Sequence, residues 1–146
     1  MSVGMRLHID SDFDKVALLA RAVRALCAEL LDADAADAVE ISLVEAVNNV
    51  IEHGYEGKPG RDVGVEVSVQ PDRIVIEVVD HAPPMKSDAL DHAPAEISFD
   101  ETNIDALPEG GMGLALIQMS MDEVEYRSGP GENRLRMVKR ISTPPA

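Results

Sequence analysis

The chain has 146 residues and a formal net charge of −14 at pH 7. A charge of that sign repels phosphate backbones and anionic membrane surfaces, so we expect neither nucleic-acid binding nor membrane association. The negative charge favours either a basic protein partner or solubility alone. The length fits a single domain over residues 1–146. Because only 3% of the residues are aromatic, aliphatic side chains must fill the core, and no base-stacking platform is expected.

Cys27 is the single cysteine, which excludes an internal disulfide and a cysteine metal site. It stands at an apolar position of a predicted helix, where a small buried side chain is the usual occupant. No apolar run approaches the roughly 20 residues that span a bilayer. The start of the sequence also lacks a basic flank followed by an apolar stretch, so we expect a cytoplasmic protein.

The first part of the chain predicts a strand and two helices. Residues 5–9 fit a short edge strand, and apolar residues then recur at helical spacing over residues 16–30. Residues 32–37 form a polar, alanine-rich break with candidate caps. A second helix is expected from about residue 37 to residue 53, ended by Gly54.

The second predicted helix carries polar side chains on one face. Glu45, Asn49 and His53 are spaced four residues apart, so they project from neighbouring turns. A carboxylate and an amide in such positions could accept a proton and bind a hard cation such as Mg²⁺ through oxygen. A solvated helix face is the alternative interpretation of the same pattern.

Two strands follow the second helix. Valines alternate with small or polar residues over residues 63–69, and residues 74–79 form the most apolar strand, which we expect at the centre of a sheet. Asp80 comes directly after that strand, where its carboxylate could accept a hydrogen bond from an exocyclic amine. An aspartate that merely initiates a turn is the alternative.

Residues 81–109 sustain neither a helical nor a strand period and are rich in proline and acidic residues. Loops of this length inside a compact domain tend to be functional lids, so a lid is predicted here.

A glycine-rich segment opens the last predicted helix. Residues 110–117 read Gly-Gly-Met-Gly-Leu-Ala-Leu-Ile. Backbone N–H groups at such a helix start can approach phosphates closely, although glycines can also form a mere flexible joint. The segment is neither a Walker loop nor a G-x-G-x-x-G fingerprint. A hairpin over residues 124–127 and 135–141 follows it, and the whole order of elements predicts an α+β two-layer sandwich.

Together and in this order, the motifs resemble the Bergerat-type ATP-binding domains of the GHKL superfamily, which gyrase, Hsp90, histidine kinases and MutL share. Within that superfamily, residues 45–55 are similar to the N-box of the small anti-sigma serine kinases of partner-switching systems, and residues 110–117 to their second glycine box. The resemblance covers nearly the whole chain. It implies the Bergerat fold, with a mixed, mainly antiparallel sheet and an ATP lid over about residues 81–109.

The resemblance also implies roles for individual residues. Glu45 would be the general base that activates the substrate hydroxyl, and Asn49 would be the Mg²⁺ ligand. Asp80 would bind the adenine amino group beside Ala82. The phosphates of ATP would be framed by Gly111, Gly113 and Leu114. ATP and Mg²⁺ are the only cofactors expected.

Two features depart from the family pattern. Ala82 stands where the first glycine box has glycine, which is costly if the backbone there needs a positive φ and harmless if it does not. The lid is strongly acidic and would repel a triphosphate if held inward. We therefore expect Asp88, Asp91 and their acidic neighbours to face outward and meet a basic partner. Arg21 and Arg24 are further candidates for partner contact, unless they are ordinary solvated charges.

The leading interpretation is an ATP-dependent serine/threonine protein kinase. It would phosphorylate a STAS-type anti-anti-sigma antagonist and, when free, sequester a sigma factor, and the resemblance favours a homodimer. The alternative is a catalytically weak or inactive binding module of the same fold, which sequesters its partner without phosphoryl transfer. A third interpretation, the catalytic domain of a sensor histidine kinase, is less favoured because little sequence before Asp12 is available for a helical hairpin with a phosphoacceptor histidine.

Overall fold

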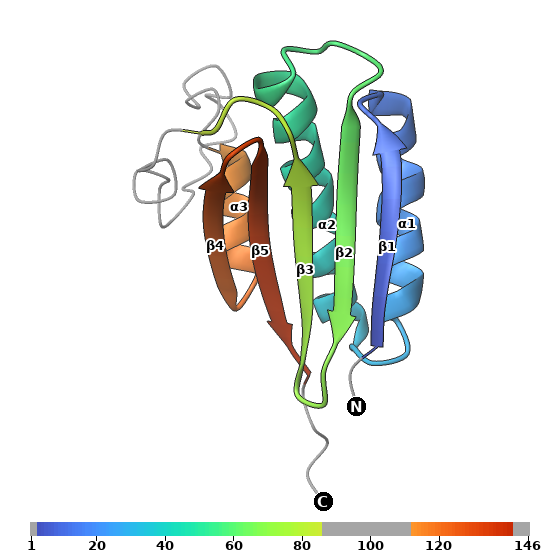
Figure 1. Ribbon diagram of the computed structural model, residues 1–146. Helices are drawn as coiled ribbons and strands as arrows, with labels where there is room; N and C mark the ends of the chain where they lie inside the picture. The colour runs from blue at the N-terminus through green and yellow to red at the C-terminus, as the bar shows by residue number, and fades with distance from the viewer. Residues whose placement is uncertain (1–2, 86–111, 142–146) are drawn as a thin grey trace, which may run out of the picture.

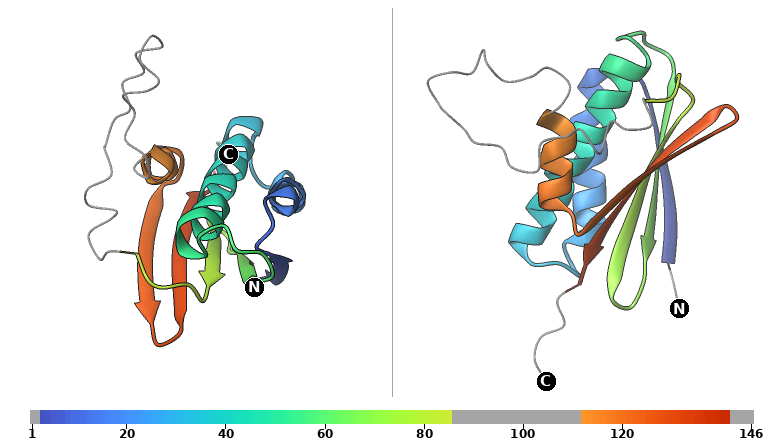
Figure 2. Two further views of the ribbon diagram at one scale, coloured as in Figure 1. Left: turned by 90° about the horizontal axis from the view of Figure 1, so that it is seen from above. Right: turned by 90° about the vertical axis from the view of Figure 1, so that its left-hand side faces the viewer.

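The structure, a computed structural model, describes residues 3–85 and 112–141. The strands in these ranges are β1 (Val3–Asp10), β2 (Asp62–Val69), β3 (Arg73–Asp80), β4 (Glu123–Gly129) and β5 (Glu132–Arg140). The helices are η1 (Phe13–Lys15), α1 (Val16–Cys27), α2 (Ala33–Asn49), the π-helical η2 (Val50–Gly54) and α3 (Met112–Ser120). One sheet forms in the order β1-β2-β3-β5-β4, and the helices cover one of its faces (Figures 1 and 2). The predicted two-layer α+β sandwich is confirmed.

β3 lies at the centre of the sheet, between β2 and β5. Ile76 and Val78 on its helix-facing side are almost fully buried. Val78 lies opposite Val65 of β2 and Leu135 of β5, and both of these residues are buried as well. The most apolar strand of the sequence is therefore the central one, as predicted, because it has a neighbour on each side and helices over one face.

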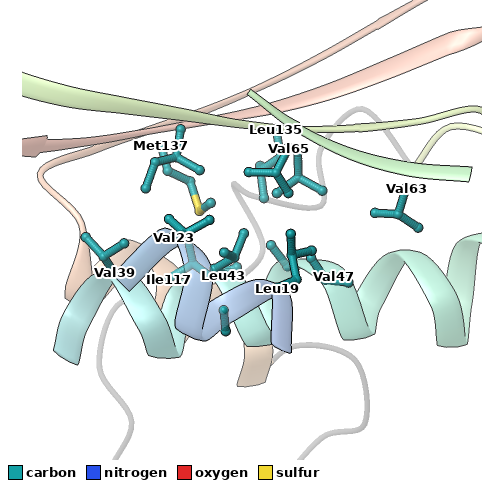
Figure 3. Packing of buried hydrophobic residues seen from close by; sticks show 14 of the residues in the cluster. Leu19, Val23, Val39, Leu43, Val47, Val63, Val65, Ile117, Leu135 and Met137 are labelled. Carbon is teal, nitrogen blue, oxygen red and sulfur yellow. The ribbon is translucent and has the colours of Figure 1, made fainter. Parts of the chain in front are cut away.

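The core lies between the sheet and the helices (Figure 3). Val23 of α1, Leu43 of α2, Ile117 of α3 and Met137 of β5 all enter it and are fully buried. Cys27 belongs to the same cluster, and burial raises the pKa of its thiol to about 11. The thiol is thus protonated at neutral pH and packs as the small apolar side chain that the sequence indicated.

α2 begins earlier than the sequence predicted. The expected break over residues 32–37 is wrong, because the helix starts at Ala33 and Asp32 is its N-cap. The Asp32 carboxylate accepts a hydrogen bond of 2.8 Å from the backbone N–H of Ala35. The alanine-rich stretch is helical because alanine has the highest helix propensity, so the connection between α1 and α2 is confined to residues 28–32.

The resemblance implied a mixed, mainly antiparallel sheet. All four pairings of the described strands are antiparallel. β3 pairs with β5 rather than with β4, so the part of the chain that joins β3 to α3 leaves from an inner strand. Among the helices of the described ranges, none is long and apolar enough to cross a membrane.

Candidate functional site

Glu45 and Asn49 lie one turn apart near the end of α2, and both side chains are half-buried. α3 packs against α2, and its second residue, Gly113, faces both of them. A methyl group on Gly113 would lie 3.0 Å from Glu45 Oε2 and 3.1 Å from Asn49 Nδ2. The two motifs that the sequence singled out therefore converge in space, and the absence of a side chain at Gly113 allows this close approach.

The end of α2 continues into the π-helical turn η2. The N–H of Tyr55 donates to the carbonyl of Val50 over 2.8 Å, a bond five residues long instead of four. Such wider turns often occur at functional sites. The wider turn keeps Ile51 and Tyr55 buried and leaves His53 exposed. The sequence placed His53 in regular four-residue spacing with Glu45 and Asn49. The π-helical turn interrupts that spacing.

Asp80 ends β3, and only 7% of the residue is exposed. Its Oδ1 accepts hydrogen bonds from the backbone N–H of Ala82 and from Asn133 Nδ2, each 2.9 Å long. Burial raises the pKa of the carboxyl above its ordinary value of 3.8, and the two hydrogen bonds oppose this rise because they favour the ionised form. A buried carboxylate of this kind is suited to accept a hydrogen bond from a ligand amine.

Ala82 is buried beside the site and belongs to the core cluster. Glu56 is the only non-glycine residue with a positive φ in the described part of the chain, so Ala82 has an ordinary backbone conformation. A methyl group on Gly54 would lie only 2.9 Å from Ala82 Cβ. The alanine at the family's glycine position is thus unstrained, and Gly54 provides the space that its methyl group fills.

The protein's two tyrosines hold the segment after β3. The hydroxyl of Tyr55 donates to the carbonyl of Asp62 over 2.7 Å and accepts the N–H of His81 over 2.9 Å. The hydroxyl of Tyr126 on β4 accepts the N–H of Met85 over 2.9 Å. Residues 80–85 are therefore fixed at two backbone amides, to Tyr55 at the end of η2 and to Tyr126 of β4, in addition to the bonds made by Asp80.

Gly113 and Leu114 lie in the first turn of α3, where Leu114 is buried in the core cluster. The other residues predicted in this region, Gly111, Asp88 and Asp91, lie outside the described residues. The predicted partner contacts of α1 differ in their surroundings. Arg21 is exposed, whereas Arg24 forms ion pairs with Asp37 and Glu40 of α2.

Sequence reasoning missed Asn133, which lies next to Asp80 on β5. A signal was present, because Asn133, Leu135 and Met137 alternate and the two apolar residues mark the buried side of the strand. The partner of Asn133 was not predictable in the same way. Its contact with Asp80 depends on the pairing of β3 with β5, which are not consecutive strands.

The arrangement presents oxygen acceptors at two places. Asp80 offers a buried carboxylate to a base, while Glu45 and Asn49 offer oxygen atoms, the ligands that Mg²⁺ prefers. No group of three histidine, cysteine or acidic side chains in residues 3–85 and 112–141 is placed to hold a metal by itself. Mg²⁺ is usually bound by one or two protein oxygens together with substrate phosphates. Between Gly113 and the side chains of Glu45 and Asn49 there is a small space that a methyl group on Gly113 would fill.

Comparison with known proteins identifies the family of this chain. Residues 9–139 match the family described as the histidine kinase-like ATPase domain. An anti-sigma F factor of Thermoanaerobacter sp. (strain X514) is 34% identical over 127 residues, which cover 85% of each chain. A serine-protein kinase RsbW of Bacillus pumilus (strain SAFR-032) is 37% identical over 97 residues, which cover 64% of this chain and 58% of that protein.

A solved structure supports the fold. The RsbU and RsbW domains from Mycobacterium tuberculosis superpose with a TM-score of 0.64 at 19% identity, over 96% of this chain and 33% of that one. The family match covers well over half of this chain, and the anti-sigma F relative matches across most of both proteins. The chain therefore belongs to the histidine kinase-like ATPase domain family, among its anti-sigma factors and serine-protein kinases of the RsbW type.

Proposed function

We propose that this protein binds ATP with Mg²⁺, phosphorylates a serine or threonine of a STAS-type anti-anti-sigma antagonist, and sequesters a sigma factor when the antagonist is phosphorylated and released. The observation that carries the proposal is the close approach of Gly113 to Glu45 and Asn49. It supports the proposal because phosphoryl transfer requires a general base, a metal ligand and a phosphate-binding backbone in one place, and these are the roles that we propose for Glu45, Asn49 and the start of α3.

In the proposed reaction, Glu45 accepts the proton of the substrate hydroxyl as its oxygen attacks the γ-phosphorus of ATP. The bond from the γ-phosphorus to the bridging β-oxygen breaks, and ADP leaves. The amide oxygen of Asn49 would hold Mg²⁺, which neutralises charge on the phosphates when bound. Gly113 lets the backbone at the start of α3 approach this point. Positioning and charge neutralisation supply most of the catalysis in reactions of this class.

Asp80 would bind the other end of the nucleotide. Its carboxylate is buried and already accepts two hydrogen bonds on Oδ1. An adenine amino group can donate to the same carboxylate, whereas the oxygen that guanine carries at that position cannot. Ala82 lines the site without backbone strain, which removes one of the two features that favoured an inactive binding module.

The Glu45→Ala variant tests whether the protein transfers phosphate. We expect transfer of labelled γ-phosphate to the co-purified antagonist to fall by about 100-fold or more, while ATP affinity stays nearly the same. Glu52→Ala is the matched control, because Glu52 is an exposed carboxylate in η2, which directly follows α2. Loss of transfer in the control, or full transfer in Glu45→Ala, would contradict the assignment of the base.

Intact-mass measurement separates the proposed kinase from the alternative module. The protein is purified with its bound partners, and ATP and Mg²⁺ are then added. A partner that gains the mass of one phosphoryl group supports the kinase. Release of a partner without a change of mass supports a module that sequesters its partner and uses nucleotide only as a conformational ligand.

The partner surfaces belong to the same proposal. We propose that Arg21 and the acidic residues Asp88 and Asp91 contact protein partners, that the protein acts as a homodimer, and that it works in the cytoplasm where sigma factors act. Neutralising Asp88, Asp91, Asp100 and Glu101 together should weaken partner binding more than ATP binding. Unchanged partner affinity in that variant would reject the docking role.

A further inference from the structure

Asn133 is a buried amide in contact with the proposed adenine-binding carboxylate. It lies on β5 directly opposite Asp80 of β3, and only 3% of it is exposed. Its Nδ2 donates to Asp80 Oδ1 over 2.9 Å and to the carbonyl oxygen of Ala82 over 2.7 Å. One side chain thus binds the carboxylate and the backbone two residues further along the chain.

Chemistry fixes the orientation of this amide. The ionised carboxylate of Asp80 and the carbonyl of Ala82 are both pure acceptors, so the atom of Asn133 that faces them must be the NH₂ group with its two hydrogens. A flipped amide would place an oxygen against two oxygens. Asn133 therefore cannot rotate without losing both bonds, and it holds Asp80 and Ala82 in one fixed relation.

The hydrogen bonds from Ala82 and Asn133 fall on one of the two carboxylate oxygens of Asp80. The bonds from Ala82 N–H and Asn133 Nδ2 both reach Oδ1. Oδ2 of Asp80 receives neither of these bonds, so it is the oxygen whose acceptor capacity they leave unused.

The charged and titratable groups around Asp80 favour this assignment. His81 follows it in the chain, and a positive charge there would lower the pKa of the Asp80 carboxyl. Tyr55, which follows η2, and Tyr126 of β4 face the same region, and burial raises the pKa of both phenols, so both are neutral at pH 7. Asp62 of β2 lies 3.8 Å from the His81 ring and faces it. Asn133 is thus the buried side chain that donates directly to the carboxylate.

We propose that Asn133 is a positioning residue for base selection: it holds Asp80 ionised and oriented so that Oδ2 accepts a hydrogen bond from the amino group of adenine and repels the oxygen of guanine. The inference rests on the proposed ATP binding. Its physical basis is that adenine presents a donor where guanine presents an acceptor. Only an ionised carboxylate is a pure acceptor, because a protonated one can donate and would tolerate both bases.

The test compares the wild type with Asn133→Leu, which has similar volume but no donor, and Asn133→Thr, which keeps one hydroxyl donor. Binding of ATP and of GTP is measured by calorimetry between pH 5 and pH 8. Ser128→Ala is the matched control, because Ser128 lies opposite Asn133 on β4 but is exposed. For Asn133→Leu at pH 7 we expect about tenfold weaker ATP binding, and a preference for ATP over GTP that falls by a similar factor.

The pH profile distinguishes positioning from a merely structural role. Without its Asn133 donor, the pKa of Asp80 should rise further, so ATP affinity in Asn133→Leu should begin to fall at a higher pH than in the wild type. Asn133→Thr should lie between the two. A structural defect would weaken ATP and GTP equally at every pH, and that result would overturn the proposal.

A titration without nucleotide keeps the two proposals separable. The pKa of Asp80 is read from its carboxyl carbon by NMR in the free wild type and in Asn133→Leu, after thermal melts show that both are folded. An unchanged Asp80 pKa would overturn the role of Asn133 even if ATP binds normally. Failure of the wild type to bind ATP would instead reject the proposed function, and base selection by Asn133 with it.

Discussion

The substitution Gly113→Ala tests whether the proposed phosphate site needs a residue without a side chain beside Glu45 and Asn49. The new methyl group would lie 3.0 Å from Glu45 Oε2, 3.1 Å from Asn49 Nδ2 and 3.4 Å from Asn49 Oδ1. The first two distances are shorter than an ordinary carbon contact of 3.4–4 Å. Both neighbours are ends of side chains, so they can yield, and each must move by a few tenths of an ångström.

The same substitution has opposite effects on stability and activity. Alanine is favoured over glycine inside a helix by roughly 0.5–1 kcal/mol. Overpacking typically costs about 1–3 kcal/mol in a rigid core, and less where flexible ends can move. We therefore expect a free energy of unfolding within about 1 kcal/mol of the wild type. A shift of about 1 Å at a catalytic group can cost about 10²-fold, so a smaller shift here should reduce phosphoryl transfer by about tenfold.

The assay pairs urea unfolding with single-turnover transfer of labelled γ-phosphate. Gly129→Ala is the matched control, because Gly129 has no positive φ and a methyl group there would meet nothing within 4 Å. The control should change neither stability nor transfer by a measurable amount. Wild-type transfer and ATP affinity in Gly113→Ala would refute the proposed role of the close approach. Failure of Gly113→Ala to fold would refute the statement that Glu45 and Asn49 can yield.

Further predictions concern the surroundings of the site. Gly54→Ala should lower the free energy of unfolding by about 1–3 kcal/mol in urea titrations, because its methyl group meets Ala82 Cβ at 2.9 Å. Adding Ala82→Gly should relieve the contact, with a coupling of roughly 0.5–3 kcal/mol; simple additivity would contradict it. Ser42→Ala should leave stability equal or higher, since Ser42 Oγ is buried without a partner in the described part of the chain, and a marked loss would reveal a partner. Asp80→Asn should abolish ATP binding yet raise stability at pH 7. The raised pKa of Asp80 means that its ionised form costs stability, so this gain should shrink as the pH falls through that pKa towards 3.8. A loss of stability at pH 7 would show that the charge is better satisfied than its burial indicates.

Much of the fold follows from patterns within short stretches of sequence. Alternating valines predicted β2, the apolar run predicted β3, and helical spacing predicted α1 and most of α2. The start of α2 was missed because the acidic residues among the alanines of residues 32–37 suggested a break. Only Asp32 acts as the cap of that helix, and the following alanines extend it.

Features that depend on distant pairing were harder to predict. The contact of Asn133 with Asp80 requires the strand order β3-β5-β4, and no local pattern specifies that order. The fit of Ala82 against Gly54 also joins separate elements, so the sequence left open whether the alanine was costly. Local motifs could therefore suggest candidate site residues, but not the buried neighbours that contact them.

The two ends of the proposed nucleotide site are held in different ways, and this makes them separable by mutation. Asp80 is fixed by hydrogen bonds from Ala82 and Asn133 in a buried place that penalises its charge. Loss of that charge should therefore remove ATP binding and stabilise the fold. Glu45 depends on the space beside Gly113, so crowding that space should slow transfer while leaving stability nearly unchanged. One folded variant would thus lack the nucleotide and another would bind it without efficient transfer. Sequestration of the partner can then be measured against each loss by itself, and a partner that still binds the Asp80 variant would show that sequestration does not require ATP.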